Sequence, residues 1–344
     1  MSDHDDSFMR REIDAIPGAV ARLLEEGADE LAAAGRALAA RDPSVLVTVA
    51  RGSSDHAAAF LKYAVELVAG IPVASVGPSV ASVYGARMRL DDAACLAISQ
   101  SGRSPDIVDM ARLARASGAL SLALTNTPGS PLAAACDRAI DIRAGAERSV
   151  AATKTFVNSA VAGLALLAAW RNDARLAEAL DALPGHLERA LDADWTALAD
   201  ALAGDGSVFI LGRGPAFAIA EEAALKFKET CQLHAEAYSA AEVMHGPVSL
   251  VGAGFPVLVL AARDAAEAAT VATAEALADK GARVFVTAAG GGRARRLGFA
   301  ATGHPLTDPL ALIVAFYGFV ERFARSTGHD PDRPVHLRKV TETR

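Results

Sequence analysis

The sequence predicts an α/β protein made of two tandem copies of one domain, each a parallel β-sheet flanked by helices on both faces. Three observations lead to this prediction. Short continuous apolar runs are typical of strands buried on both faces. Helical stretches alternate with those runs, as in doubly wound sheets. The pattern also restarts along the chain: Arg213-Gly214 lies 162 positions after Arg51-Gly52.

The first copy follows one or two leading helices, which we expect within residues 12–40 with a break near Pro17 and Gly18. A helix is expected to begin at residues 52–55, directly after the first strand. Strands are predicted at residues 45–50, 71–76, 94–98, 120–124 and 139–142.

The second copy begins with a strand and glycine turn at residues 207–214, after helices predicted at 151–170 and at 174–203 with a break at Pro184. The 162-residue offset also aligns Ile98 with Leu260 and residues 122–125 with 284–287. We therefore expect four regions: a tail with lead-in helices (1–40), a first domain (41–190), a second domain (191–330) and a C-terminal tail (331–344).

Composition excludes several classes of protein. The 344 residues include 52% hydrophobic residues, enough for two cores, yet no apolar run reaches membrane-spanning length. The acidic start resembles neither a signal nor a transit peptide, and three scattered cysteines fit a reducing compartment, so we expect a cytoplasmic protein. A net charge of −7 without a basic stripe argues against nucleic-acid partners.

Cofactor motifs are also missing from the sequence. Phe217 stands where the third glycine of a dinucleotide fingerprint would fall, and there is no Walker lysine motif. A histidine and an acid at 234 and 236 lack the cysteine pair of a zinc deaminase. We expect no cofactor and no metal.

Two loops of the first copy have the composition of a phosphate site. Each follows a predicted strand and offers hydroxyls, glycines and the free N–H groups of a following helix. Ordinary helix capping is the alternative, but five hydroxyls and an amide in two loops favour an anion. The predicted ligands are Ser53, Ser54, Ser99, Gln100, Ser101 and Ser104. The equivalent residues of the second copy, 261–264, are Ala-Ala-Arg-Asp.

The second copy instead carries a dense group of charges at residues 221–247, in an otherwise alanine-rich chain. Glu222, Lys226 and Glu229 share one helix face, so a solvated ion-pair ladder is the plain interpretation. A proton-transfer site is the alternative. His245 lies before a glycine-proline turn, and Lys339 lies in a C-terminal tail with enough apolar character to dock.

These motifs resemble the SIS (sugar isomerase) family, and within it the isomerase half of glucosamine-6-phosphate synthase and the stand-alone deaminases. The most specific segments are residues 224–229, 234–238 and 242–247, and the resemblance covers nearly the whole chain. It implies two doubly wound, flavodoxin-like domains. It also implies that the serine loops hold a sugar phosphate and that Val150 and Ala152 lie in a sugar-contacting loop.

The resemblance further implies the catalytic roles. Glu229 would move a proton between C1 and C2, His245 would help to open the sugar ring, and Lys339 would lie at the carbonyl end, where the synthase forms a Schiff base. Lys226 is predicted to be a further catalytic residue or a residue that supports Glu229. Because the family's histidine reaches the site of a neighbouring subunit, a homodimer is implied. A carboxylate of raised pKa suits such proton transfer.

The predicted reaction is conversion of an amino-sugar phosphate, glucosamine-6-phosphate first, to fructose-6-phosphate with release of ammonia. We expect this reaction because few residues precede the lead-in helix, which leaves no glutamine-hydrolysing domain. Arg103 replaces the family's usual acid, and Ala152 replaces a serine, so the substrate stays open. Alternatives are a fructosamine- or galactosamine-6-phosphate substrate, isomerisation alone, the isomerase part of an aminotransferase-like protein, or a phosphosugar sensor.

Overall fold

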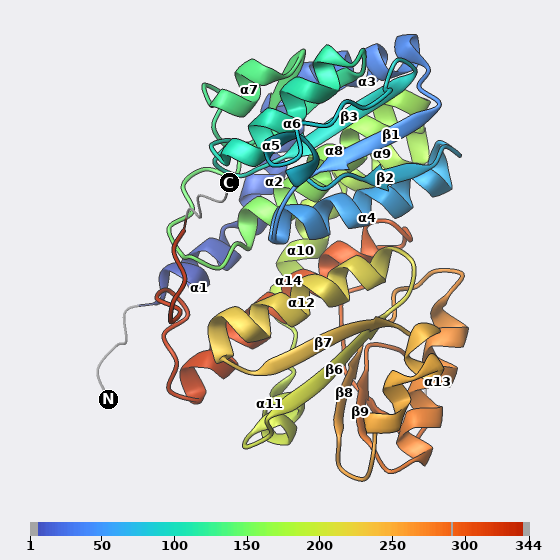
Figure 1. Cartoon of the computed structure of the whole chain (residues 1–344). Coiled ribbons are helices and arrows are strands. Elements are labelled where there is room, and N and C mark those ends of the chain that lie inside the picture. Colours follow the sequence, from blue (N-terminus) through green and yellow to red (C-terminus); the bar gives the residue numbers. More distant parts are fainter. Residues whose placement is uncertain (1–5, 290–291, 340–344) are drawn as a thin grey trace. The chain divides into compact units, whose positions relative to one another are not determined.

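The computed structural model describes residues 6–289 and 292–339, which form two compact units. We call them the β1–β5 unit and the β6–β10 unit (Figure 1). The β1–β5 unit comprises Ile16–Glu147, Lys154–Pro184 and the chain from Arg338. The β6–β10 unit comprises the chain up to Ala15, Arg148–Thr153 and Gly185–Leu337. Both units are therefore assembled from separate stretches of the chain.

The β1–β5 unit is built on a five-stranded, all-parallel sheet in the order β2-β1-β3-β4-β5. Its strands are β1 (Val45–Val49), β2 (Val73–Ser75), β3 (Ala93–Ile98), β4 (Leu120–Thr125) and β5 (Arg138–Asp141). All six residues of the central strand β3 are buried, as its apolar run predicts. The five strands predicted from the sequence are confirmed, with small shifts at their ends.

Helices cover both faces of this sheet. The helices α3, α4 and α8 pack together, and α5, α6 and α7 pack together, because right-handed crossovers in opposite directions along the sheet place α4 and α6 on opposite faces. The helices are α2 (Ile16–Glu26), α3 (Ala28–Arg41), α4 (Ser53–Val68), α5 (Ser79–Ser82), α6 (Pro105–Ala116), α7 (Pro131–Ala135), α8 (Lys154–Arg171) and α9 (Ala174–Asp181).

The β6–β10 unit repeats the same plan. Its parallel sheet has the order β10-β9-β8-β6-β7, which is the order of the first sheet once β6 is matched to β1. The strands are β6 (Ser207–Gly212), β7 (His234–Ser239), β8 (Pro256–Val259), β9 (Arg283–Val286) and β10 (Arg295–Arg296). The helices are α1 (Phe8–Asp14), α10 (Leu183–Leu191), α11 (Thr196–Leu202), α12 (Pro215–Cys231), η1 (Glu242–His245), η2 (Pro247–Leu250), α13 (Glu267–Asp279) and α14 (Asp308–Ser326).

The duplication extends to the backbone of the first βα turn. Gly52 has φ 57° and ψ −135°, and Gly214 has φ 58° and ψ −135°. This left-handed conformation favours glycine at both positions. The tandem duplication predicted from the 162-residue offset is therefore confirmed by topology and by local geometry.

The helix breaks expected near Pro17 and at Pro184 are present but lie two residues earlier, at Ala15 and Ala182. The leading helices break after Asp14 and at Gly27, and Pro17 lies inside the first turn of α2, where its missing N–H costs nothing. Pro184 likewise lies in the first turn of α10. The segment after α12, where no strand was predicted, is the edge strand β7.

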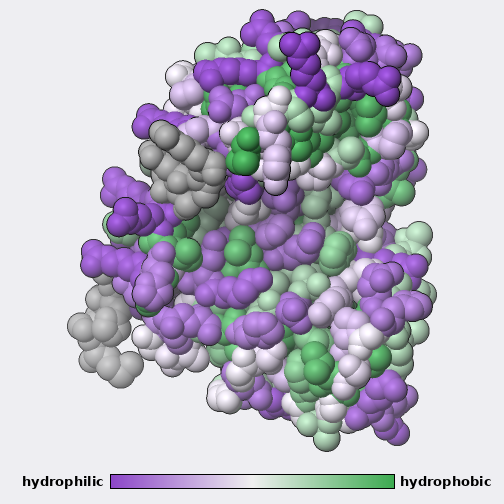
Figure 2. All heavy atoms as spheres, in the orientation of Figure 1, coloured by the Kyte–Doolittle hydropathy of each residue, from purple (hydrophilic) through white to green (hydrophobic). Residues whose placement is uncertain are grey.

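The distribution of hydrophobic residues on the surface and in the helices bears on membrane association. Figure 2 shows hydrophilic and hydrophobic residues interspersed on the visible face. Large hydrophobic side chains that are exposed include Tyr84 and Leu250. Among the residues that the structure describes, no helix is both long enough and apolar enough to cross a membrane.

Candidate functional site

The two serine-rich loops lie at the same edge of the β1–β5 sheet. Ser53 and Ser54 are the first residues of α4, directly after β1, and residues 99–104 connect β3 to α6. Because β1 and β3 are adjacent parallel strands, their carboxyl ends meet at one edge. All six predicted phosphate ligands therefore belong to one rim, at the starts of α4 and α6.

Local hydrogen bonds shape the second of these loops. The Ser99 hydroxyl accepts a bond from the Gly102 N–H (3.2 Å), and the Ser101 hydroxyl accepts one from the Arg103 N–H (3.3 Å). Gly102 has φ +60°, and a Cβ there would lie 2.2 Å from the Ser130 hydroxyl. A tight turn with glycine at its centre therefore holds the hydroxyls of this loop.

An ion pair that the sequence analysis did not identify links the two loops. Arg51, just before the first loop, donates to the Asp106 carboxylate from Nε (2.7 Å) and pairs with it through Nη2 (2.6 Å). Asp106 is buried in the first turn of α6, whereas half of the Arg51 side chain is exposed. Both nitrogens contact the same oxygen, Oδ2, so Arg51 is held by two charge-assisted contacts to one point of the carboxylate.

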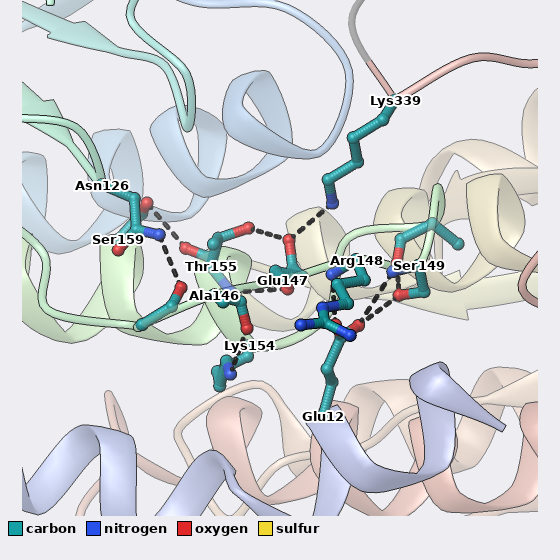
Figure 3. A network of polar contacts seen from close by, with 12 residues as sticks. Glu12, Asn126, Ala146, Glu147, Arg148, Ser149, Lys154, Thr155, Ser159 and Lys339 are labelled. Atoms are coloured by element: carbon teal, nitrogen blue, oxygen red, sulfur yellow. Dashed lines mark hydrogen bonds and ion pairs between the residues drawn. The ribbon is translucent and has the colours of Figure 1, made fainter. Parts of the chain in front are cut away.

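Another carboxylate without a predicted role, Glu147, fixes the lysine of the C-terminal tail. The Glu147 side chain is fully buried and accepts bonds from the Thr155 N–H (3.0 Å), the Thr155 hydroxyl (2.7 Å) and the Lys339 ammonium (3.0 Å) (Figure 3). Burial acts to raise the pKa of Glu147, but the Lys339 charge and the Thr155 bonds outweigh it, so this pKa lies below its usual value.

The neighbouring stretch 148–153 belongs to the β6–β10 unit and contains Val150 and Ala152, both half-buried. It is held by Glu12 of α1, whose carboxylate accepts bonds from the N–H groups of Arg148 and Ser149 and from the Ser149 hydroxyl (Figure 3). The predicted sugar-contacting loop is therefore an ordered segment that a buried acid braces.

The charged face of α12 is buried rather than solvated. Glu222 and Lys226 have no exposed side-chain area, and Glu229 retains 19%. The Lys226 ammonium lies 3.4 Å from Glu222 Oε1 and also pairs with Glu229 Oε2. The interpretation as a surface ion-pair ladder is therefore wrong for Glu222 and Lys226.

Lys226 remains charged in this environment. Burial acts to lower the pKa of Lys226, but Glu222 and Glu229 outweigh it, so this pKa is raised. Glu229 lies in the last turn of α12, at the negative end of the helix dipole, where a carboxylate needs a cation. Lys226 supplies that cation, and Glu229 is thereby a positioned carboxylate that reaches the surface.

His245 ends the short helix η1 and is exposed, next to Gly246 with φ +146°. The structure therefore brings together Glu229 with Lys226, and the serine loops with each other. Lys339 is held by Glu147. Sequence reasoning missed Glu147, Asp106 and Tyr317, which hydrogen-bonds Glu222 (3.0 Å), because no local motif marks such long-range partners.

Within residues 6–289 and 292–339, no group of three or more His, Cys, Asp and Glu side chains is arranged to hold a metal ion.

Comparisons with known proteins agree with this architecture. A family model described as the SIS domain matches residues 41–169 and 201–301. Over 310 residues the chain is 36% identical to the glutamine–fructose-6-phosphate aminotransferase (isomerizing) of Symbiobacterium thermophilum, a match that covers 85% of this chain and 50% of that protein. The chain spans about half the length of the curated relatives that it matches.

Solved structures show the same fold. A crystal structure of a candidate phosphosugar isomerase from Silicibacter pomeroyi DSS-3 is 59% identical, with a TM-score of 0.93 over 95% of this chain and 100% of that one. The C-terminal domain of glucosamine-fructose-6-phosphate aminotransferase from Francisella tularensis is 24% identical, with a TM-score of 0.84 over 97% and 99% of the two chains.

Proposed function

This chain belongs to the SIS domain family, and from that premise we propose that it is a phosphosugar isomerase that acts on an amino-sugar phosphate. The substrate proposed first is glucosamine-6-phosphate, which with one water gives fructose-6-phosphate and ammonia. The observation that carries the proposal is Glu229, a partly exposed carboxylate held by a fully buried lysine.

The proposed roles follow the chemistry of each group. The hydroxyls and helix N–H groups around Ser53, Ser54, Ser99, Gln100, Ser101 and Ser104 bind the phosphate. Glu229 removes the proton from C2 and returns it to C1, which needs one base that stays close to both carbons. Lys226 supplies positive charge as negative charge develops on the enol oxygen.

Two further roles complete the reaction. His245 transfers the proton that opens the sugar ring, and it does so in the site of a partner subunit of a homodimer. Lys339 lies at the carbonyl end, and Val150 and Ala152 contact the sugar. We also propose that the protein is cytoplasmic and that the chain divides into four regions, with boundaries at residues 40, 190 and 330.

The reaction is tested directly with purified protein. Glucosamine-6-phosphate should yield fructose-6-phosphate and ammonia in equal amounts, and Glu229→Gln should lower kcat by about 10²- to 10⁴-fold, the usual contribution of a general base. Absence of turnover, or turnover that Glu229→Gln leaves unchanged, would refute the proposal.

The substrate is tested with a panel. Residues 99–105 have the form that we associate with deaminases and sugar-specific isomerases, so ammonia release is placed first. Fructosamine- and galactosamine-6-phosphate, and fructose-6-phosphate with and without an ammonia source, separate the remaining reactions. Binding of all these compounds without turnover would indicate a phosphosugar sensor instead.

A further inference from the structure

A row of polar groups is buried between α12 and α14 of the β6–β10 unit. Glu222 and Lys226 come from α12, and Tyr317 comes from α14; all three are 0% exposed. The surrounding interface is aromatic, with Phe227 packed edge-on against Phe316 at 5.1 Å between ring centroids. Burial of three polar groups in such an apolar interface is costly and calls for a structural or functional explanation.

The contacts connect Tyr317 to the surface carboxylate. The Tyr317 hydroxyl donates to Glu222 Oε1 (3.0 Å), and the Lys226 ammonium lies 3.4 Å from the same oxygen. Lys226 also donates to Glu229, the member of the row with the greatest side-chain exposure, 19%. A continuous path of polar contacts therefore leads from the hydroxyl of α14 to the proposed base.

Stability alone does not account for this arrangement. Desolvation of two carboxylates and an ammonium is expensive, and well-packed apolar residues commonly stabilise a protein as much as a buried ion pair does. The arrangement does, however, control the position of a charge. Lys226 has two carboxylate partners, and the hydroxyl of Tyr317 satisfies part of Glu222, so the ammonium stays shared with Glu229.

We propose that Tyr317, acting through Glu222 and Lys226, is a positioning residue for Glu229 in proton transfer. The inference rests on the proposed function. Without the hydroxyl, Glu222 has one donor fewer and draws Lys226 toward itself, which loosens the hold on Glu229. Substrate binding, which depends on other groups, is unaffected.

The test is Tyr317→Phe, which removes one oxygen and keeps the ring. We expect kcat to fall about tenfold or more, KM to stay within about twofold, and the kinetic isotope effect of a C2-deuterated substrate to rise, because loss of a transition-state contact appears in kcat. Tyr238→Phe is the matched control, since Tyr238 donates to a carboxylate of the same unit, Glu236 (2.9 Å), outside this row. Tyr238→Phe should keep wild-type kcat.

A second variant tests the same inference in case Tyr317→Phe does not fold. Glu222→Gln keeps the side-chain shape but removes the charge that draws Lys226 away from Glu229. The ammonium then leaves its shared position in the opposite direction, which should also lower kcat. If the row acts as one unit, the double variant loses no more than the worse single variant, rather than the product of the two losses.

The outcomes separate the inference from the function on which it rests. If Tyr317→Phe, measured well below its Tm, has the kcat and isotope effect of the wild type, the inference is wrong. The proposed function still stands in that case, because the wild-type protein turns over its substrate. Losses that multiply in the double variant also overturn the inference. A wild-type protein that converts no phosphosugar overturns both, and is recognised before any variant is made.

Discussion

Lys226 shows how one residue can change the meaning of a sequence pattern. Spacing on α12 correctly groups it with Glu222 and Glu229, but spacing carries no information about what covers that helix face. The helix α14, which lies far later in the chain, packs against α12, and Lys226 is completely buried. Burial turns a weak surface pair into a charge whose position is strongly determined.

Glu147 provides a prediction on stability at the residue scale. Its pKa is lowered from 4.5 in the folded protein, so it stabilises the fold above that pH, and this contribution is lost as the pH falls through the lowered value. Glu147→Gln should therefore lower Tm by a constant amount from pH 8 to about pH 5. Below about pH 4 the difference from wild type should shrink.

Thermal unfolding of both proteins between pH 3 and pH 8 measures this difference. Removing one partner of a buried pair costs up to about 3 kcal/mol, although partial exposure of Lys339 reduces the figure. The exposed Glu25 of the same unit gives a control variant, Glu25→Gln, expected to change Tm little. A Tm difference for Glu147→Gln that grows in acid would contradict the assignment.

Gly102 gives a second prediction at this scale. Gly102→Ala places a Cβ 2.2 Å from the Ser130 hydroxyl, at a φ of +60°. Gly85 has a similar φ of +55°, but nothing lies within 4 Å of a Cβ there. Both alanine variants lose about 1–2 kcal/mol to the left-handed backbone, and only Gly102→Ala adds the clash.

Calorimetric Tm values of the two glycine variants decide this point. We expect the larger decrease for Gly102→Ala, together with weaker binding of a sugar phosphate. Equal decreases would show that the loop relaxes without cost, and that its tight turn does not fix the hydroxyls.

At the scale of elements, we expect the two serine loops to depend on the Arg51–Asp106 pair. Asp106→Asn keeps the shape but removes the charge that holds Arg51, and bonds to charged groups contribute about 1.5–3 kcal/mol. We expect KM for a phosphorylated substrate to rise about tenfold or more, with a smaller change in kcat.

The matched control is Asp109→Asn in the same helix, because Asp109 pairs with Arg112 (3.2 Å) on the exposed face of α6. Competition by inorganic phosphate gives an independent measurement, and its inhibition constant should rise in parallel with KM. If Asp106→Asn and Asp109→Asn behave alike, the pair does not organise the phosphate loops.

Elements differ in how far the sequence determines them. The buried strands of both sheets were predictable because a short, continuous apolar run is typical of a parallel strand covered on both faces. Strand β7 was not predicted because its charged residues interrupt the apolar run that marks the other strands. His234 to Ser239 does alternate, however, and the repeat offset aligns Ala235 with Val73 of β2. The prolines located the helix breaks only to within two residues, because proline inside a first turn and proline between helices give the same local pattern.

The candidate site was predictable only in part, for a related reason. Motifs of adjacent residues identified the serine loops and the acids of α12. The groups that hold them come from elsewhere in the chain, such as Glu147 for Lys339 and Tyr317 for Glu222. Such pairings depend on the packing of whole elements, which periodicity within one element does not specify.

At the scale of the whole molecule, the two copies share a topology and divide the polar groups between them. The β1–β5 unit has the serine loops, and the β6–β10 unit has Glu229 and the exposed His245. Exposure of His245 on η1 fits donation to a second copy of the chain, as the family resemblance implies. This part of the proposed function predicts that a complete active site needs residues from two chains.

Mixed dimers test that prediction. Glu229→Gln and His245→Asn should each be inactive alone, whereas a heterodimer of the two contains one site with an intact Glu229 and an intact His245 of the partner subunit. Random mixing of the two chains should therefore restore roughly a quarter of wild-type activity, because half of the dimers are mixed and each has one complete site. If each chain instead supplies both groups of its own site, every site in the mixture lacks one of them and no activity returns.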